Sequence, residues 1–169
     1  MLTLSRLEGK AASTPRGTVD LVSLAQASMV GLSALGSHRG IEFSLEASGP
    51  ALVQGDPDDL RLLMDNLLGN ALKFSPKDAI VAMGIHKQGQ EVVLVLRDHG
   101  PGIAPELRER IGQPFVRGNS AIEGSGLGLT IALEVAHTHG ATLTLENRAN
   151  GPGLEVRVRF PAANSPIQD

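Results

Sequence analysis

The sequence predicts an α/β sandwich, an α+β fold in which a mixed, mostly antiparallel sheet carries helices on one face. Strand-like segments occur in consecutive pairs, whereas a doubly wound parallel sheet would alternate single strands with helices. The two best-marked helix-like segments each have one apolar face, which indicates packing on one side. The strand pairs are residues 41–47 with 51–54, 79–87 with 91–97, and 142–147 with 154–160.

Composition narrows the class of protein. The 169 residues suit one domain with a substantial core. The formal net charge of −3 gives no basic footprint, so we expect no nucleic-acid partner. Cysteine is absent, which excludes disulfides and thiolate metal sites and fits a reducing cytosol. No apolar run could span a bilayer and no signal-peptide pattern is present, so we expect a cytoplasmic chain.

The N-terminal residues 1–17 are expected to form the end of a helix and a linker. Leu4 and Leu7 share one helical face and Gly9 suits a C-terminal stop, although a frayed terminus is an equal alternative. Residues 18–162 are then one domain, and residues 163–169 are a loose tail.

The first half of the domain contains two helix-like segments. An apolar face predicts a helix over residues 19–36, followed by the strands at 41–47 and 51–54. The second helix begins after Asp56, which can cap it, and has Pro57 at its first position. It ends at Ser75, because the residue before a proline resists the α conformation.

The second half begins with a hairpin. Its strands, 79–87 and 91–97, are followed by a short helix over 105–111 and by residues 112–123, which read as a mobile loop. A helix over 126–139 then ends at a glycine, and the last strand pair closes the domain.

The main functional signal is the segment Asp98-His99-Gly100-Pro101-Gly102-Ile103, which follows a buried strand. Its glycines allow positive φ and let a ligand approach the main chain. A carboxylate beside apolar walls is costly to bury without a partner, and an exocyclic amine of a ligand would supply one. Taken alone, the segment fits an ordinary turn equally well.

Four segments in order resemble the motifs of the ATP-binding domain of bacterial sensor histidine kinases, in the GHKL superfamily. NLLGNALKF (66–74) resembles the N box, DHGPGI (98–103) the first glycine box, QPFVR (113–117) the F box and GSGLGL (124–129) the second glycine box. Four motifs in the same order identify a family far more specifically than any one of them does. The resemblance implies a Bergerat-type ATP-binding fold, ATP and Mg²⁺ as ligands, and phosphotransfer to histidine in two-component signal transduction.

Asp98 is the expected base-specificity residue. An ionised carboxylate only accepts hydrogen bonds, so it suits the six-amino group of adenine and opposes the carbonyl oxygen of guanine. The mismatch costs roughly 2 kcal/mol or more, so the site should prefer ATP to GTP. The resemblance assigns the same adenine contact to this residue.

Asn66, Asn70 and Lys73 share one helical stripe. A single helical asparagine is ordinarily a solvated surface residue, but the three together favour a ligand site. The resemblance gives Asn70 the Mg²⁺, which prefers oxygen ligands beside phosphates, and places Asn66 near the phosphates. ATP-hydrolysing relatives such as DNA gyrase carry a glutamate at the position of Asn66. Since asparagine cannot take a proton from water, we expect weak hydrolysis and transfer to an outside histidine.

The phosphates are expected to meet main-chain N–H groups and cations. Residues 124–129 precede a helix, whose N-terminus favours anions, although the segment matches neither a Walker loop nor a dinucleotide fingerprint. Lys73 and Arg117 are the expected phosphate cations, with solvated surface charge as the alternative. Phe74 stands where the family often has tyrosine and can form a wall of the nucleotide site. Phe115 is expected to anchor the mobile loop of residues 112–123, which would act as a lid.

These expectations define one set of site residues. The expected catalytic residues are Asn66, Lys73 and Arg117, and the metal ligand is Asn70. The expected nucleotide-binding residues are Asn66, Asn70, Lys73, Phe74, Asp98, Gly100, Gly102, Ile103, Phe115, Gly124, Ser125, Gly126, Leu127, Gly128 and Leu129.

None of the five histidines lies in the His-Glu/Asp-x-x-x-Pro-like setting of a phosphoacceptor. His137 and His139 diverge around a helix, so they suit a metal poorly and are expected to favour the helix C-terminus through its dipole. We therefore expect an excised catalytic domain. Its partners would be a histidine-bearing dimerisation domain of the same parent protein and a response regulator, with the parent anchored in the bacterial inner membrane.

Two other functions remain open. One is a serine kinase of the same superfamily, such as an anti-sigma factor. Residues 1–9 argue against it, because they resemble the end of a dimerisation hairpin. The other is a non-catalytic, ATP-dependent interaction module.

Overall fold

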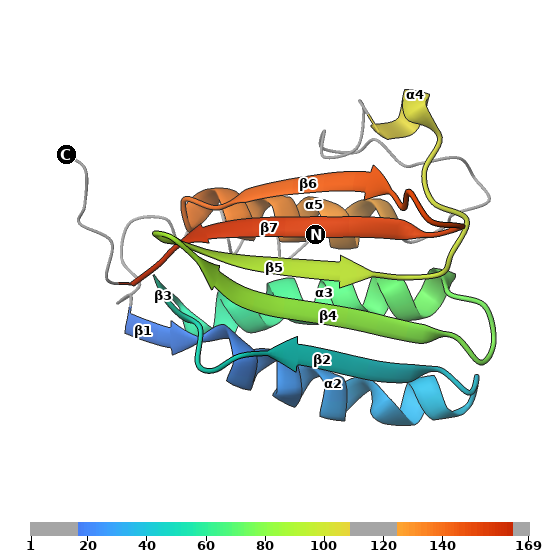
Figure 1. Cartoon of the computed structure of the whole chain (residues 1–169), viewed down its shortest axis with the longest axis horizontal. Helices are drawn as coiled ribbons and strands as arrows, with labels where there is room; N and C mark the ends of the chain where they lie inside the picture. Colours follow the sequence, from blue (N-terminus) through green and yellow to red (C-terminus); the bar gives the residue numbers. More distant parts are fainter. Residues whose placement is uncertain (1–16, 109–124, 164–169) are drawn as a thin grey trace.

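The computed structural model describes residues 17–108 and 125–163. Within them, one five-stranded sheet has the order β2-β4-β5-β7-β6. Its strands are β2 (Glu42–Ala47), β4 (Ile80–Gln88), β5 (Glu91–Arg97), β7 (Leu154–Pro161) and β6 (Thr142–Asn147) (Figure 1). β2 and β4 are parallel, and the other pairs are antiparallel. The predicted mixed, mostly antiparallel sheet is confirmed.

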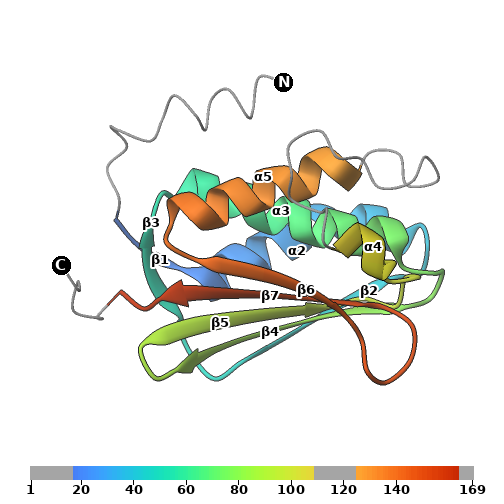
Figure 2. The same cartoon turned by 90° about the horizontal axis from the view of Figure 1, so that it is seen from above.

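Three helices cover one face of this sheet (Figure 2). They are α2 (Leu21–Ser37), α3 (Pro57–Phe74) and α5 (Ser125–Thr138), and α3 packs against both of the others. The short helix α4 (Pro105–Arg108) is the described part of the helix expected over 105–111. The expected mobile loop, the N-terminal helix end and the tail from residue 164 lie outside the described residues.

The start of the domain differs from the prediction. Residues 17–20 were expected to be linker and helix, but they form the strand β1 (Gly17–Asp20), which pairs antiparallel with β3 (Leu52–Gly55). The helix cannot begin at Val19, because the Asp20 carboxylate caps α2 by accepting from Val22 N at 3.1 Å. Because β3 pairs with β1 and β2 pairs with β4, the strands expected at 41–47 and 51–54 do not pair with each other.

The central helix α3 has the ends that its sequence predicts. The Asp56 side chain accepts from Asp58 N at 2.8 Å and Asp59 N at 3.3 Å, with Pro57 in the first turn. The helix ends at Ser75. Its buried face supplies much of the core through Leu60, Leu63, Met64, Leu67, Leu68, Ala71 and Leu72.

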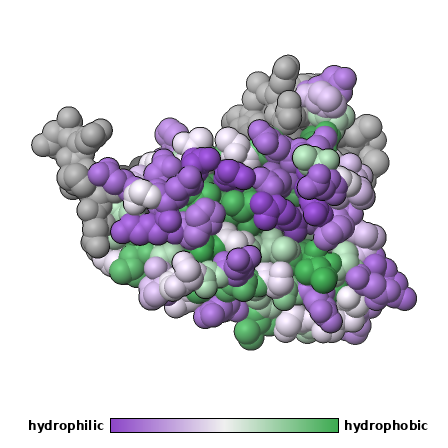
Figure 3. Space-filling model, viewed as in Figure 1, coloured by the Kyte–Doolittle hydropathy of each residue, from purple (hydrophilic) through white to green (hydrophobic). Residues whose placement is uncertain are grey.

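The other face of the sheet carries several charged side chains, and Figure 3, seen from this side, shows hydrophilic residues with apolar patches between them. Arg97 and Arg157 each pair with Glu155 at 2.8 Å. Partial burial opposes ionisation of Glu155, but hydrogen bonds and charge from both arginines outweigh it and hold its pKa below the ordinary value. The cross-strand neighbours Arg157 and Arg159 flank Val95 and Val93, which are buried. Val92, Leu94 and Leu96 alternate with these two valines along β5 and belong to the core cluster, so the helix-covered core lies on the opposite face.

Among the described residues, no helix combines the length and the apolar character needed to cross a membrane.

Candidate functional site

Asp98 follows the last residue of β5 and is only 6% exposed. Its Oδ1 accepts from Gly100 N at 2.9 Å and from Leu154 N at 3.0 Å. No described residue donates a hydrogen bond to Oδ2. An ionised carboxyl oxygen only accepts hydrogen bonds, so Oδ2 is suited to an N–H group of a ligand.

The loop after Asp98 fits only with glycine at two positions. A Cβ on Gly100 would lie 2.8 Å from Phe74 O, and a Cβ on Gly102 would lie 2.5 Å from Asn147 Oδ1. Gly102 also has φ of +74°, which disfavours a side chain. The loop is thereby brought against the last residue of α3.

Asn66 and Asn70 face the first turns of α5. Asn66 Nδ2 donates to Leu62 O at 2.8 Å, which directs Oδ1 away from its own helix. A Cβ on Gly128 would lie 3.0 Å from Asn66 Oδ1 and 3.5 Å from Asn70 Oδ1. The glycine thus lets the α5 main chain approach both amides. The N-terminal N–H groups of this 14-residue helix lack helical partners and favour an anion.

The last turn of α3 carries Lys73 and Phe74. Lys73 is exposed, with Nζ 5.6 Å from the Phe74 ring centroid, and Phe74 is half-buried. Arg39, which the sequence did not single out, holds this turn. Its guanidinium donates to Leu72 O at 2.5 Å and also to Ser75 O. A cation at a helix C-terminus suits both the carbonyls and the dipole.

These groups gather at one end of the molecule, where β5 and α3 end and α5 begins (Figures 1 and 2). Asn70 precedes Phe74 by about one helical turn, or about 6 Å. The Asp98 loop contacts Phe74, so it lies beside the turn that follows Asn70. The structure thus places an open acceptor at one side of the site and two amide oxygens at the other.

A divalent cation fits the amide side of the site. The described residues contain no group of three His, Cys, Asp or Glu side chains able to hold a metal ion. Among the residues that the structure describes, asparagine oxygens are the protein ligands left for a cation here, beside oxygens of a bound ligand. Mg²⁺ binds in this way, because it keeps few protein ligands and takes phosphate oxygens and water.

The structure describes most of the expected site residues. Asn66, Asn70 and Gly128 converge, and Asp98, Gly100, Gly102 and Ile103 form the loop beside Phe74. Leu129 lies in the first turns of α5, half-buried. Ser125, Gly126 and Leu127 are described only as part of that helix, while Phe115, Arg117 and Gly124 lie outside the described residues.

Asn147 and Arg148, which the sequence did not single out, hold the Asp98 loop. Ile103 N donates to Asn147 Oδ1 at 2.7 Å, and Asn147 Nδ2 donates to Ile103 O at 2.7 Å. Arg148 Nη1 donates to Asp98 O at 3.1 Å. All three bonds end on main-chain atoms, so no pair of side-chain types in the sequence could reveal them.

The expectation for His139 is wrong. This residue is buried, and its Nε2 accepts from Asp56 N at 3.1 Å. Nδ1, 2.7 Å from Val135 O, must then carry the single proton. A neutral ring cannot act as a cation on the helix dipole. It ties the end of α5 to the N-cap of α3 instead.

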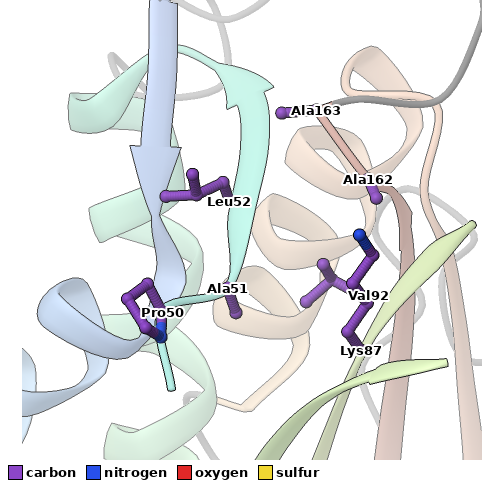
Figure 4. Close-up of a pocket in the computed structure, with 7 residues that line it drawn as sticks. All are labelled: Pro50, Ala51, Leu52, Lys87, Val92, Ala162 and Ala163. Carbon is purple, nitrogen blue, oxygen red and sulfur yellow. The ribbon is translucent and has the colours of Figure 1, made fainter.

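A cavity of about 100 Å³ lies elsewhere and is lined by Pro50, Ala51, Leu52, Lys87, Val92, Ala162 and Ala163 (Figure 4). Along β5, Val92 is six residues before Asp98, a distance of about 20 Å. Binding pockets for small molecules usually enclose about 300 Å³ or more. The cavity is therefore separate from the candidate site and too small for a nucleotide.

Known proteins resemble this chain in sequence and in fold. The sensor protein QseC of Salmonella typhi is 34% identical over 162 residues, which cover 95% of this chain and 35% of that protein. The solved structure of the mycobacterial sensor histidine kinase MprB matches with a TM-score of 0.76 at 30% identity, over 88% of this chain and 99% of that chain. ShkA in complex with AMPPNP matches with a TM-score of 0.82 at 28% identity, over 97% of this chain and 35% of that one.

The resemblance to catalytic domains of sensor histidine kinases is confirmed by these matches. The chain spans about a third of the length of the curated relatives that it matches. Residues 55–164, more than half of the chain, match the model of one family. The chain belongs to the family of histidine kinase-, DNA gyrase B- and HSP90-like ATPases.

Proposed function

We propose that this chain binds Mg-ATP and transfers the γ-phosphoryl group to a histidine on a separate helical domain of a sensor histidine kinase. The observation that carries the proposal is the open Oδ2 of a buried Asp98 at the same end of the molecule as Asn66, Asn70 and the start of α5. One side suits a base, and the other suits phosphates. The related ShkA structure holds AMPPNP, an analogue of ATP.

Adenine is the base that fits Asp98. The Oδ1 atom is occupied by two main-chain N–H groups, so only Oδ2 is left to read the base. The six-amino group of adenine donates to it, whereas the six-carbonyl oxygen of guanine would face another acceptor. ATP should therefore bind more tightly than GTP.

The phosphates fit the other side. The main-chain N–H groups of the first α5 turn and the Lys73 side chain bind and orient the phosphate oxygens. Asn70, with Asn66 beside it, would hold Mg²⁺ through amide oxygen. When bound, this ion neutralises negative charge on the phosphates. Arg117 remains the second proposed phosphate cation.

The reaction needs little covalent chemistry from this chain. A neutral imidazole nitrogen of the acceptor histidine attacks the γ-phosphorus, the bond to the β–γ bridging oxygen breaks, and ADP leaves. The site residues contribute position and positive charge. Asn66 cannot take a proton from water, so hydrolysis without the acceptor should be slow.

The partners follow from this reaction. The phosphoacceptor lies on a histidine-bearing dimerisation domain of the same parent, and a response regulator accepts the phosphoryl group next. We further propose that the parent is anchored in the bacterial inner membrane and presents this domain to the cytoplasm.

Asp98→Asn tests nucleotide recognition. Asparagine can keep an oxygen facing the N–H groups of Gly100 and Leu154, and it then replaces Oδ2 with a donor that faces the adenine amine. Titration calorimetry should show at least tenfold weaker ATP binding and a smaller preference for ATP over GTP. Unchanged ATP affinity in this variant would contradict the assigned role of Asp98.

Phosphotransfer is tested with a supplied histidine-bearing helical hairpin. Labelled ATP should yield an acid-labile, alkali-stable product on the hairpin, because phosphohistidine is hydrolysed in acid. An acid-stable product would support the serine-kinase alternative. No transfer despite ATP binding would support the non-catalytic module.

A further inference from the structure

The loop of residues 98–104 between β5 and α4 contains no helix or strand, so its main chain needs hydrogen bonds from other segments. The β6–β7 hairpin supplies them at both ends. Asp98 N donates to Leu154 O at 3.1 Å, and Leu154 N donates to Asp98 Oδ1 at 3.0 Å. At the other end the bonds come from Asn147, the last residue of β6.

Asn147 uses both halves of its side-chain amide on one residue. Its Oδ1 accepts from Ile103 N, and its Nδ2 donates to Ile103 O, each at 2.7 Å. The amide thus pairs with Ile103 as the main chain of a neighbouring strand would. Both polar groups of Ile103 are fixed by a single side chain.

The residue before Ile103 is adapted to this contact. Gly102 has φ of +74°, and a Cβ there would lie 2.5 Å from Asn147 Oδ1. Neither the turn nor the approach of the Asn147 amide would tolerate a larger residue. Loop and hairpin therefore fit each other at this point.

We propose that Asn147 is a positioning residue for the base end of the nucleotide site, an inference that rests on the proposed function. Asp98 and Ile103 lie at opposite ends of one loop, and the same hairpin holds both. The hairpin thereby sets the position of the half-buried Ile103 side chain relative to Asp98 Oδ2. With this spacing fixed in advance, a purine enters without having to order the loop.

The experiment compares Asn147→Ala with Asn150→Ala. Asn150 is the matched control, because it is exposed in the same hairpin and its side chain has no hydrogen bond among the described residues. By calorimetry, Asn147→Ala should raise the Kd of ATP and of ADP by the same factor, about tenfold. The factors match because both nucleotides share the base. Asn150→Ala should leave both constants unchanged.

A second readout separates positioning from general destabilisation. In phosphotransfer to a supplied histidine-bearing hairpin, Asn147→Ala should raise KM for ATP while kcat at saturating ATP stays the same. Asn147→Asp keeps the acceptor but loses the donor to Ile103 O, so it should also raise KM. Thermal unfolding followed by circular dichroism should give midpoints for both alanine variants within a few degrees of the parent chain.

Each outcome bears on a separate claim. Unchanged nucleotide affinity in Asn147→Ala, an equal loss in Asn150→Ala, or a fall in kcat alone overturns the positioning role. If the parent chain binds ATP and Asp98→Asn weakens that binding while Asn147→Ala does not, only the positioning role fails. If the unsubstituted chain binds neither ATP nor ADP, both the proposed function and the positioning role fail.

Discussion

At Asp98 the two oxygens of one carboxyl group have different tasks. Oδ1 belongs to the fold, because it accepts from Gly100 N and Leu154 N. Oδ2 has no donor among the described residues, and we propose that it accepts from the base of the nucleotide. Removing the whole carboxyl group would therefore mix a structural loss with a binding loss. Changes at this residue are informative only when Oδ1 is preserved, as in Asp98→Asn.

Gly128 is a residue where one methyl group should separate binding from folding. A Cβ there would lie 3.0 Å from Asn66 Oδ1, which is tight, and close to Asn70 as well. Gly128→Ala should push the amides away from the phosphate position and weaken Mg-ATP binding about tenfold or more. Alanine favours a helix over glycine, so the free energy of unfolding should fall by less than about 1 kcal/mol. Calorimetry and urea unfolding measure the two effects.

Gly31→Ala is the matched control, because Gly31 lies inside α2 and a Cβ there would have neither Asn66 nor Asn70 within 4 Å. A Cβ there would meet only the flexible end of Arg61 at 3.4 Å. The variant should bind ATP normally and unfold at an equal or higher urea concentration. Equal ATP affinity in both glycine variants would show that close approach at Gly128 is not needed for binding.

The sequence could reveal site residues whose type carries the chemistry. A carboxylate followed by two glycines and an asparagine pair on one helical stripe are such signals. The residues that hold these site residues in place gave no such signal in the sequence. Asn147, Arg148 and Arg39 all act on main-chain carbonyl or N–H groups, which every residue possesses. Such contacts depend on how distant segments meet, and no local pattern records that.

Among the elements, α3 was predictable and β1 was not. Asp56, Pro57 and Ser75–Pro76 specify both ends of α3 through local capping and steric effects. β1 has only four residues and exists because its partner β3, more than 30 residues later, lies beside it. Asp20 has two roles that no single pattern combines, because it both ends this strand and caps the helix that follows.

Acid should weaken the attachment of α2 through Asp20. Its carboxylate accepts from Ala51 N at 2.9 Å, Val22 N at 3.1 Å and Ser23 Oγ at 2.8 Å. Partial burial opposes ionisation, but these bonds outweigh it and lower the pKa of Asp20. A lowered pKa stabilises the fold above the ordinary value of about 4, and this stability is lost as pH falls through the folded-state value. Urea unfolding at pH 7, 4 and 3 should therefore show decreasing stability.

Asp20→Asn is the control for this pH dependence. Asparagine caps a helix about as well as aspartate but does not titrate. The variant should lose less stability than the parent chain between pH 4 and pH 3. Some loss should remain, because the pKa of Glu155 is also lowered. An identical pH profile in both proteins would rule out a contribution from Asp20.

In the whole molecule, α3 is the helix that relates all other parts. It packs between α2 and α5, carries Asn66 and Asn70, and ends beside the Asp98 loop. Side chains from other segments hold both of its ends. His139 accepts from Asp56 N at its start, and Arg39 donates to its last carbonyls. The site therefore depends on contacts that lie up to the full length of the helix away, about 27 Å.

His139→Ala tests the attachment at the start of α3. The change leaves the buried Asp56 N–H without its acceptor and removes a ring that packs against Gly55. We expect the free energy of unfolding to fall by about 2–3 kcal/mol. His137→Ala, an exposed neighbour on the same helix end, should change it by less than about 0.5 kcal/mol. The chain has no Trp or Tyr, so urea unfolding is best followed by far-ultraviolet circular dichroism. Equal losses in the two variants would mean that His139 does not hold α5 to α3.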